Sequence, residues 1–251
     1  MLKKSWDERR DLLIGKSKEE AIDLAVDHFI GIAKKAIQER GRFSVALSGG
    51  STPKAIYQTL SRQKKHSLDW GKVLFFFSDE RSVPLDHPDS NYHMAMEAGL
   101  KYLPIPKSHI FRMKAEQDIH THAKAYEHLI DKHLGADLFD LVMLGVGEDG
   151  HTASLFPGTK ALEERGHAVC ANYIPQKKIW RMTLTFDCIN NSSHIVLYVL
   201  GKEKKDIVRR ILSPPSNCAP LPAERIGTNN NKSLWIIDLD SFLLLQNSYG
   251  T

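Results

Sequence analysis

The sequence predicts an α/β protein built on a mostly parallel, Rossmann-like sheet with helices on both faces. Short apolar runs with the length of buried strands alternate along the chain with longer segments of helical period. Such alternation is typical of a parallel sheet, because a crossover helix connects each strand to the next. The chain has 251 residues, no internal repeat and no long flexible linker, so we expect one domain over residues 1–251.

The first helix is predicted at residues 17–40. Ser17 and Glu20 form a capping-box pattern at its start, and apolar residues then recur with the 3.6-residue period of a helix. Gly41 stands where a glycine commonly ends a helix. The pattern therefore predicts both ends of this helix.

The other elements follow from similar signals. Strands are predicted where aliphatic, β-branched and aromatic residues run together, and helices where apolar residues keep the helical period. The second helix is expected to begin at Pro53, because proline favours the first helical position. A stretch rich in proline and asparagine at 213–231 is expected to be a surface loop. The predicted strands are 43–47, 73–77, 140–144, 180–186, 194–200 and 235–239, and the remaining helices are 53–61, 89–100, 115–134 and 202–212.

Composition excludes several classes of protein. The hydrophobic fraction is 42% and the charged fraction 25%, both ordinary for a globular chain. No apolar run approaches the roughly 20 residues needed to cross a bilayer, and residues 1–10 lack the apolar core of a signal peptide. We therefore expect a cytoplasmic protein without a membrane partner, present as a monomer or a weak homo-oligomer.

Charge and cysteine content argue against several kinds of partner and site. The formal net charge is +4, but the lysine-rich pieces at 64–65 and 202–205 are too short for a nucleic-acid-binding face. A modest positive excess suits a small anionic substrate. The cysteines are widely spaced and form no CxxC pair, which argues against a disulfide framework or a zinc knuckle. We expect packed thiols at Cys170, Cys188 and Cys218.

Candidate functional residues lie where predicted strands end, and ligands of open α/β sheets bind beyond the carboxyl ends of the strands. The first group follows the strand at 43–47. Gly49 and Gly50 would let the backbone turn tightly and direct N–H groups at an anion. Ser51 and Thr52 would add hydroxyl donors beside a helix N-terminus. This pattern indicates a phosphate-binding loop, although an ordinary glycine-rich turn has the same composition and the lysine of a Walker A loop is missing.

A second group, at residues 78–81, follows the strand at 73–77. Arg81 is suited to two-pronged binding of a phosphate or carboxylate. Asp79 or Glu80 would act as an acid, a base or an orienting group. A solvated loop with local salt bridges is the alternative interpretation.

A third group, at residues 145–152, contains a formal GxGxxG pattern after a predicted strand. We reject a dinucleotide-binding site, because Pro157 follows too soon for a long helix and Cys170 lies about where the ribose-binding acid would be needed. The loop is better interpreted as a tight turn that presents Asp149 and His151 together. Histidine acts as a base near neutral pH, and a neighbouring carboxylate fixes its orientation. A structural histidine in a glycine-rich turn is the alternative.

Two further cations complete the set. Arg181 begins a predicted strand segment, and Lys204 follows the strand at 194–200; either is alternatively a surface cation. His120 and His122 are two residues apart in a predicted helix and therefore point to different faces. Because no cluster has the spacing of metal ligands, we predict neither a metal nor a cofactor.

Taken together, these segments resemble the 6-phosphogluconolactonase family, within the larger glucosamine-6-phosphate isomerase/deaminase superfamily. The most specific match is Asp-Gly-His-Thr-Ala-Ser-Leu-Phe-Pro-Gly at 149–158, whereas the Gly-Ser-Thr-Pro loop at 50–53 is common to the superfamily. The matches run in order from residue 46 to 235 and so cover most of the chain. They are 46–53, 78–81, 83–84, 90–92, 145–158, 181–185, 201–204, 221–223 and Trp235.

The resemblance implies hydrolysis of 6-phospho-D-glucono-1,5-lactone to 6-phosphogluconate, the second step of the oxidative pentose phosphate pathway, without a cofactor. It implies that His151 activates a water molecule and that Asp149 orients or tunes His151. The substrate- and phosphate-binding residues would be Gly49, Gly50, Ser51, Thr52, Asp79, Arg81, Arg181 and Lys204.

Two alternatives stay open on the sequence. A glucosamine-6-phosphate deaminase or sugar-phosphate isomerase resembles this chain up to His151, but its proton-transferring glutamate would fall at Phe156, which cannot titrate. A sugar-phosphate sensor without catalytic activity would keep the phosphate-binding residues and is expected to lose Asp149 or His151. Both residues are present here.

Overall fold

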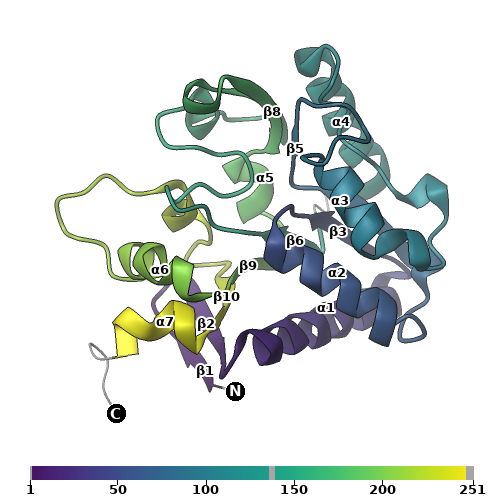
Figure 1. Ribbon diagram of the computed structural model, residues 1–251. Helices are drawn as coiled ribbons and strands as arrows, with labels where there is room; N and C mark the ends of the chain where they lie inside the picture. The colour runs from purple at the N-terminus through teal and green to yellow at the C-terminus, as the bar shows by residue number, and fades with distance from the viewer. Residues whose placement is uncertain (1, 136–138, 247–251) are drawn as a thin grey trace.

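The structure, a computed structural model, describes residues 2–135 and 139–246. These residues build a seven-stranded sheet in the order β1-β2-β10-β9-β6-β3-β4, in which the edge strand β1 is antiparallel and its other strands are parallel (Figure 1). The predicted α/β class with a mostly parallel sheet is thereby confirmed. The strands are β1 (Leu2–Ser5), β2 (Arg10–Gly15), β10 (Ser233–Asp238), β9 (Ile195–Val199), β6 (Leu141–Leu144), β3 (Phe43–Leu47) and β4 (Val73–Phe77).

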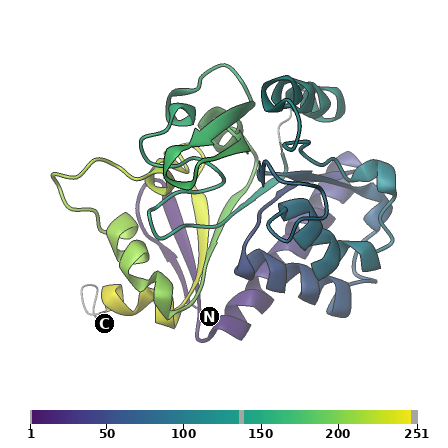
Figure 2. The same cartoon turned by 45° about the horizontal axis from the view of Figure 1, so that its top comes forward.

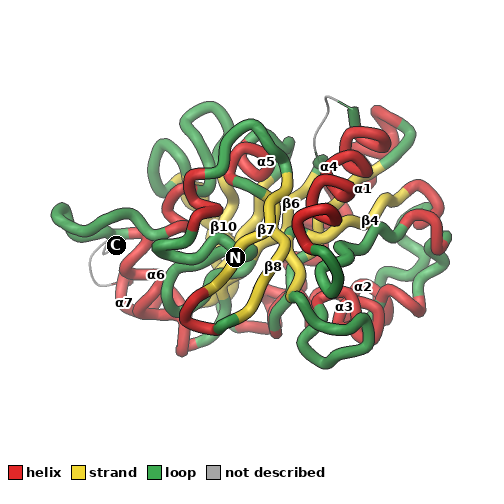
Figure 3. Tube along the Cα trace, turned by 90° about the horizontal axis from the view of Figure 1, so that it is seen from above, coloured by secondary structure: helices red, strands yellow, loops and turns green. Residues whose placement is uncertain are grey.

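A second, antiparallel sheet has the strand order β5-β8-β7. Its strands are β5 (Asp79–Arg81), β8 (Ile179–Leu184) and β7 (Val169–Ile174). Seen from above in Figure 3, β7 and β8 lie side by side near the centre of the molecule. Because β5 begins two residues after β4 ends, this small sheet is connected directly to the carboxyl end of the main sheet.

Helices cover both faces of the main sheet. In Figure 2 the purple and blue helices α1 and α2 lie on one side of the strands, and the yellow-green helices α6 and α7 lie on the other. The α-helices are α1 (Lys18–Arg40), α2 (Ser51–Gln63), α3 (Asn91–Ala98), α4 (Ile119–Leu134), α5 (Phe186–Asn190), α6 (Lys205–Leu212) and α7 (Leu239–Gln246). Short 3-10 helices lie at Trp70–Lys72, Leu100–Tyr102, Lys107–His109, Lys160–Glu163, Pro175–Lys177, Lys202–Lys204 and Pro222–Arg225.

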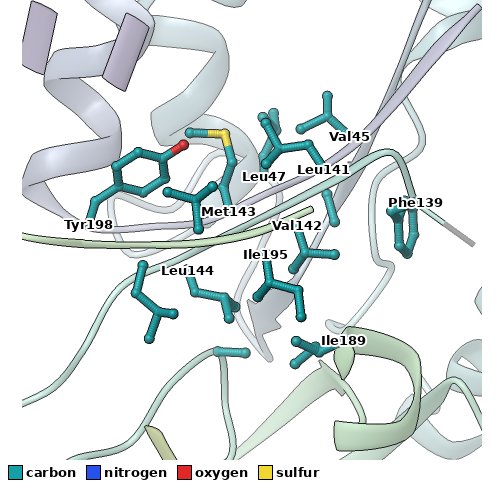
Figure 4. Packing of buried hydrophobic residues seen from close by; sticks show 14 of the residues in the cluster. Val45, Leu47, Phe139, Leu141, Val142, Met143, Leu144, Ile189, Ile195 and Tyr198 are labelled. Carbon is teal, nitrogen blue, oxygen red and sulfur yellow. The ribbon is translucent and has the colours of Figure 1, made fainter. Parts of the chain in front are cut away.

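The core is centred on β3, β6 and β9, all of whose residues are buried. Strands that are covered on both faces read as continuous apolar runs, which is why the sequence pattern located them. Figure 4 shows side chains from these strands projecting to both sides, with Met143 and Tyr198 on one side and Leu144 and Ile195 on the other.

The two central strands β3 and β6 are neighbours whose connections leave toward opposite faces of the sheet. The chain after β3 enters α2, on the face covered by α1, whereas the chain after β6 passes to the small sheet. A crevice forms where connections diverge in this way, and open α/β sheets bind ligands there. The loops at 48–50 and 145–151 border this point.

Helix α1 has the predicted ends. The Ser17 side chain accepts a hydrogen bond from the backbone N–H of Glu20, and Gly41 ends the helix with φ of 75°. The Glu20 carboxylate accepts from the N–H of Lys16 at 2.6 Å, one residue before the position that the capping-box pattern predicts.

Several predicted boundaries are wrong, and two of them have a clear local cause. Helix α2 begins at Ser51, two residues before Pro53, because Gly50 takes a left-handed φ of 104° and turns the chain at once into the helix. The predicted strand 180–186 ends at Leu184, since the Thr185 hydroxyl accepts from the N–H of Cys188 and starts α5. The strands predicted at 43–47 and 73–77 have the predicted bounds, and the other predicted helices and strands are present with shifted ends.

The segment 213–231 is only partly a surface loop. Residues Pro222, Ala223 and Glu224 are buried in a 3-10 turn, and Ala223 N–H donates to the carbonyl of Gly150 at 3.0 Å. The prediction of three packed thiols is also wrong in one case, because Cys218 lies in the exposed part of this segment. Cys170 and Cys188 are buried as expected.

Candidate active site

A pocket lies at the carboxyl ends of the main strands, at the divergence of β3 and β6. Nine of the ten predicted site residues line it, and the tenth, Asp149, contacts His151 directly. The structure therefore brings together the residues that the sequence placed at separate strand ends. The lining consists of Ser48, Gly49, Gly50, Ser51, Thr52, Pro53, Asp79, Arg81, Gly145, Val146, Gly147, His151, Ala153, Arg181, Tyr198 and Lys204.

The His151 ring is held by three neighbours. Its Nδ1 lies 2.5 Å from Oδ1 of Asp149. The ring stacks on Phe156, with centroids 3.9 Å apart and planes inclined by 13°. At the other neighbour, Gly147, a Cβ atom would lie 2.0 Å from Nδ1, so a residue with a side chain does not fit there. The position and tilt of the imidazole are thus set by a carboxylate, an aromatic ring and a glycine.

The loop itself is a chain of tight turns. Gly147 N–H donates to the carbonyl of His151 at 2.9 Å, and Gly150, with φ of 77°, donates to the carbonyl of Gly147 at 3.0 Å. The Thr152 hydroxyl donates to the carbonyl of Gly145 at 2.8 Å. Turns and bridges follow instead of a helix, so the geometry of a dinucleotide-binding βαβ unit is absent from this described segment.

The Asp149 carboxylate is ionised at neutral pH. Partial burial acts to raise its pKa, but hydrogen bonds and charge from His151 outweigh burial and lower the pKa below its ordinary value. An ionised carboxylate accepts hydrogen bonds only, so Nδ1 of His151 carries the proton and donates a hydrogen bond to Asp149. The other ring nitrogen, Nε2, is then free to accept a proton.

The loop before α2 presents backbone donors to the pocket. Gly50 precedes the helix, no side chain caps its first N–H groups, and its first turn has no acidic residue. These unsatisfied donors and the helix dipole favour an anion. The Tyr57 hydroxyl holds the loop from below, accepting from Ser48 N–H at 3.1 Å and donating to its carbonyl at 2.8 Å.

Glu80 has a structural role. Its buried carboxylate accepts from the N–H groups of Asn91 at 2.7 Å and Tyr92 at 2.9 Å, and from the Ser90 hydroxyl at 3.0 Å. Glu80 therefore caps α3. Burial raises the pKa of its carboxyl group, and the hydrogen bonds from these donors only partly offset that rise. Of the two acids that the sequence left open as acid, base or orienting group, Asp79 alone lines the pocket.

Two arginines face the same pocket from neighbouring strands. Arg81 on β5 is the direct cross-strand partner of Arg181 on β8. Like charges opposite each other in a sheet repel, and an anion between them relieves that repulsion. Asp79 offsets part of the charge, since its Oδ2 lies 3.8 Å from Nη1 of Arg181 and accepts from Ser154 at 2.6 Å. Burial lowers the pKa of Arg181, while Asp79 acts to raise it.

Lys204 reaches the pocket from the turn after β9. Its Nζ donates to the carbonyl of Val146 at 2.9 Å, which connects this turn to the His151 loop. Gly201 N–H is bound by both carboxylate oxygens of Asp238 at 3.0 and 3.1 Å. The pocket contains the positive charges of two arginines and Lys204, together with the α2 N-terminus, and the negative charge of the Asp79 carboxylate. The excess of positive charge favours binding of an anion.

Two neighbours received no role in the sequence reasoning, although one of them, Asn91, lies in the matched segment 90–92. Asn91 donates to both the carbonyl and the carboxylate of Asp79, and its Oδ1 lies so close to Gly49 that a Cβ there would be 1.9 Å away. Tyr198 lies under the pocket with a buried hydroxyl that has no partner among the described residues. The resemblance marked the segment of Asn91, but the contacts themselves depend on how loops distant in the chain meet.

Among residues 2–135 and 139–246 there is no group of three or more His, Cys, Asp or Glu side chains arranged to hold a metal ion. In the same residues no helix combines the length and the apolar character needed to cross a membrane.

Comparisons with known proteins all point to the same family. A family model described as glucosamine-6-phosphate isomerases/6-phosphogluconolactonase matches residues 16–235. A Chlamydia muridarum protein named 6-phosphogluconolactonase is 42% identical over 94% of this chain and 91% of its own length. A Synechocystis protein of the same name is 38% identical over 81% of this chain and 85% of its own length.

Solved structures agree with these sequence matches. The 6-phosphogluconolactonase from Trypanosoma cruzi superposes with a TM-score of 0.85 at 31% identity, over 97% of this chain and 99% of its own. The enzyme of that name from Thermotoga maritima gives a TM-score of 0.76 at 31% identity, over 92% of this chain and 99% of its own. The structural similarity therefore extends over more than nine-tenths of the chain.

Proposed function

This chain belongs to the glucosamine-6-phosphate isomerase/6-phosphogluconolactonase family, and from that premise we propose that it hydrolyses 6-phospho-D-glucono-1,5-lactone to 6-phosphogluconate, in the oxidative pentose phosphate pathway. One observation carries the proposal. A histidine oriented by an ionised carboxylate lies in the same pocket as two arginines, a lysine and an uncapped helix N-terminus. A base beside an anion site is what hydrolysis of a phosphorylated lactone requires.

In this mechanism Nε2 of His151 takes a proton from a water molecule as the water oxygen attacks the lactone carbonyl carbon. The carbonyl oxygen gains negative charge and needs donors; backbone N–H groups near Gly49 and Gly50, or the Arg81 guanidinium, lie in the pocket for this. The bond from the carbonyl carbon to the ring oxygen then breaks, and the ring oxygen receives the proton from His151. The new carboxylic acid loses its proton to solvent.

Asp149 supports both proton transfers. As a hydrogen-bonded carboxylate it keeps the proton of neutral His151 on Nδ1 and stabilises the imidazolium that forms during attack. The phosphate of the substrate is assigned to Ser51, Thr52, Arg181 and Lys204, with Arg81 alongside; Gly49 and Gly50 contribute backbone donors, and Asp79 orients Arg181.

The residue at one position argues against deamination and isomerisation. The residue at which the resemblance places the deaminase glutamate is Phe156, a buried apolar side chain with 2% of its surface exposed. A phenyl ring neither accepts nor donates a proton, so that route lacks a required group. A sensor without catalytic activity is disfavoured because Asp149 and His151 are in contact in the pocket.

Several sequence expectations stay predictions. They are one domain over residues 1–251, a cytoplasmic location, a monomeric or weakly oligomeric state, and the absence of a nucleic-acid partner. The single-domain proposal is supported by the pairing of β2 with β10, which joins early and late parts of the chain in one sheet.

A direct assay tests the proposed activity. The purified protein is added to freshly prepared 6-phosphogluconolactone, and acid release is followed with the spontaneous hydrolysis subtracted. We expect rapid enzyme-dependent hydrolysis and no ammonia release from glucosamine 6-phosphate. Ammonia release without lactone hydrolysis would assign the chain to the other branch of the family.

Replacing Arg181 with alanine is expected to raise KM about ten- to a hundredfold, because a charged hydrogen bond to phosphate contributes about 1.5–3 kcal/mol. The fall in kcat should be smaller, since the water attacks at the other end of the substrate. Asp79 keeps its bonds to Ser154 and Asn91, so the fold is expected to persist. The control is Arg62→Ala on the exposed surface of α2. An unchanged KM in Arg181→Ala would remove this arginine from the phosphate site.

A further inference from the structure

Phe156 contacts two of the residues assigned to the reaction, although it has no polar atom. Its ring is almost fully buried and lies nearly parallel to the His151 imidazole, with centroids 3.9 Å apart. The Arg181 guanidinium carbon lies 5.3 Å from the centroid of the same ring. One phenyl group therefore touches both the residue assigned as the base and a residue assigned to the phosphate.

The polar restraints on these two residues are incomplete. The bond to Asp149 restrains His151 at one ring atom, Nδ1. Arg181 has a long contact of 3.4 Å to Ser154, and its buried Nε has no hydrogen-bond partner among the described residues. A flat ring restrains the whole face of the imidazole by stacking, and it supports a guanidinium through a cation–π contact.

The backbone holds Phe156 in place independently of the pocket. Its carbonyl accepts from both the N–H and the hydroxyl of Thr159, at 3.2 and 2.8 Å. Asn172 on β7 in turn donates to the Thr159 hydroxyl at 2.9 Å. Ahead of it, Ala153 takes an unusual φ of 47° that turns the chain between His151 and Phe156. The backbone at Phe156 is thus tied to the small sheet through Thr159 and Asn172.

We infer that Phe156 is a positioning residue that holds the catalytic base His151 and the phosphate ligand Arg181 in one fixed geometry. This inference rests on the proposed function and adds to it a coupling between binding and turnover. Because the substrate is held at its phosphate while attack occurs at its carbonyl, the distance between Arg181 and His151 sets how the carbonyl meets the base. Misplacement of about 1 Å costs about a hundredfold in rate.

Phe156→Leu tests the role of the flat ring, because leucine keeps an apolar side chain without a planar face. We expect kcat to fall about ten- to a hundredfold and KM to rise about three- to tenfold through the loosened Arg181. Phe156→Tyr keeps the ring and should retain most of the activity. The matched control is Phe43→Leu, a fully buried phenylalanine at the amino end of β3, which should lose stability but keep kcat and KM.

Double variants separate positioning from general loosening. When His151 is already replaced by alanine, adding Phe156→Leu should cause no further fall in kcat. When Arg181 is already replaced by alanine, adding Phe156→Leu should cause no further loss of 6-phosphogluconate binding, measured by calorimetry. Effects of unchanged size in both backgrounds would overturn the inference, as would wild-type kcat and KM in Phe156→Leu. Binding of inorganic phosphate by the single variants tests the contact between Phe156 and Arg181 without any turnover. A wild-type protein that fails the lactonase assay can therefore be told apart from a failure of this inference.

Discussion

His151→Ala should lower kcat for lactone hydrolysis about a hundred- to ten-thousandfold, the range that a positioned general base contributes. The loss arises because no other titratable side chain occupies the position that the stacked, carboxylate-bound imidazole holds in the pocket. Product affinity should stay nearly unchanged, since the arginines, Lys204 and the α2 N-terminus are untouched.

The measurement is steady-state hydrolysis corrected for the spontaneous reaction, together with calorimetric binding of 6-phosphogluconate. His66→Ala serves as control, because His66 is exposed and lies outside the pocket. Turnover close to that of the wild type in His151→Ala would remove the histidine from the mechanism. A parallel loss of product binding would instead indicate that the pocket had collapsed.

Gly147→Ala should lower kcat about a hundredfold, although it adds one methyl group. A Cβ at this position would lie 2.0 Å from Nδ1 and 2.1 Å from Cε1 of His151, and 2.8 Å from Oδ1 of Asp149. The imidazole must therefore move away from the carboxylate that orients it. The backbone tolerates alanine, because Gly147 is not among the glycines with positive φ.

Kinetics and thermal unfolding should be measured together for this variant. Gly31→Ala in α1 is the matched control, since nothing lies within 4 Å of an added Cβ there. We expect Gly147→Ala to lose turnover while its melting temperature stays close to that of the wild type. Full activity in Gly147→Ala would show that the close packing of His151 against this glycine is unimportant for catalysis.

The parts of the fold that the sequence predicted best are those with the strongest local patterns. Helix α1 carries a long apolar period between capping residues, and β3 and β4 are continuous apolar runs buried inside the sheet. The strands β1, β2, β5 and β7 were missed. Strand β1 is an exposed edge with two lysines, β5 has three residues, and the burial of β2 and β7 depends on partners far away in the sequence.

The predicted residues that follow β3, β6 and β9 could be grouped because strand ends in a parallel sheet converge. Asp79, Arg81 and Arg181 lie instead in the small antiparallel sheet, which the sequence did not predict. The contacts among them were not predictable. The sequence singled out Phe156 because it cannot titrate, and only the structure shows it stacked on His151 and beside Arg181. The chain reaches Phe156 from His151 through the turn at Ala153, for which an alanine at positive φ gives no sequence signal.

The position of β10 between β2 and β9 has a consequence for how the molecule forms. Strand β2 pairs with β10 and with β1, so the hairpin β1–β2 has no other part of the main sheet to join until β10 exists. At about 5–20 residues per second, synthesis up to Asp238 takes roughly ten to fifty seconds. During that time β2 has no partner on the side where β10 later pairs. Sheet closure is then a late event of high contact order. Lys3 and Lys4 on β1 disfavour edge-to-edge association with other nascent chains during that interval.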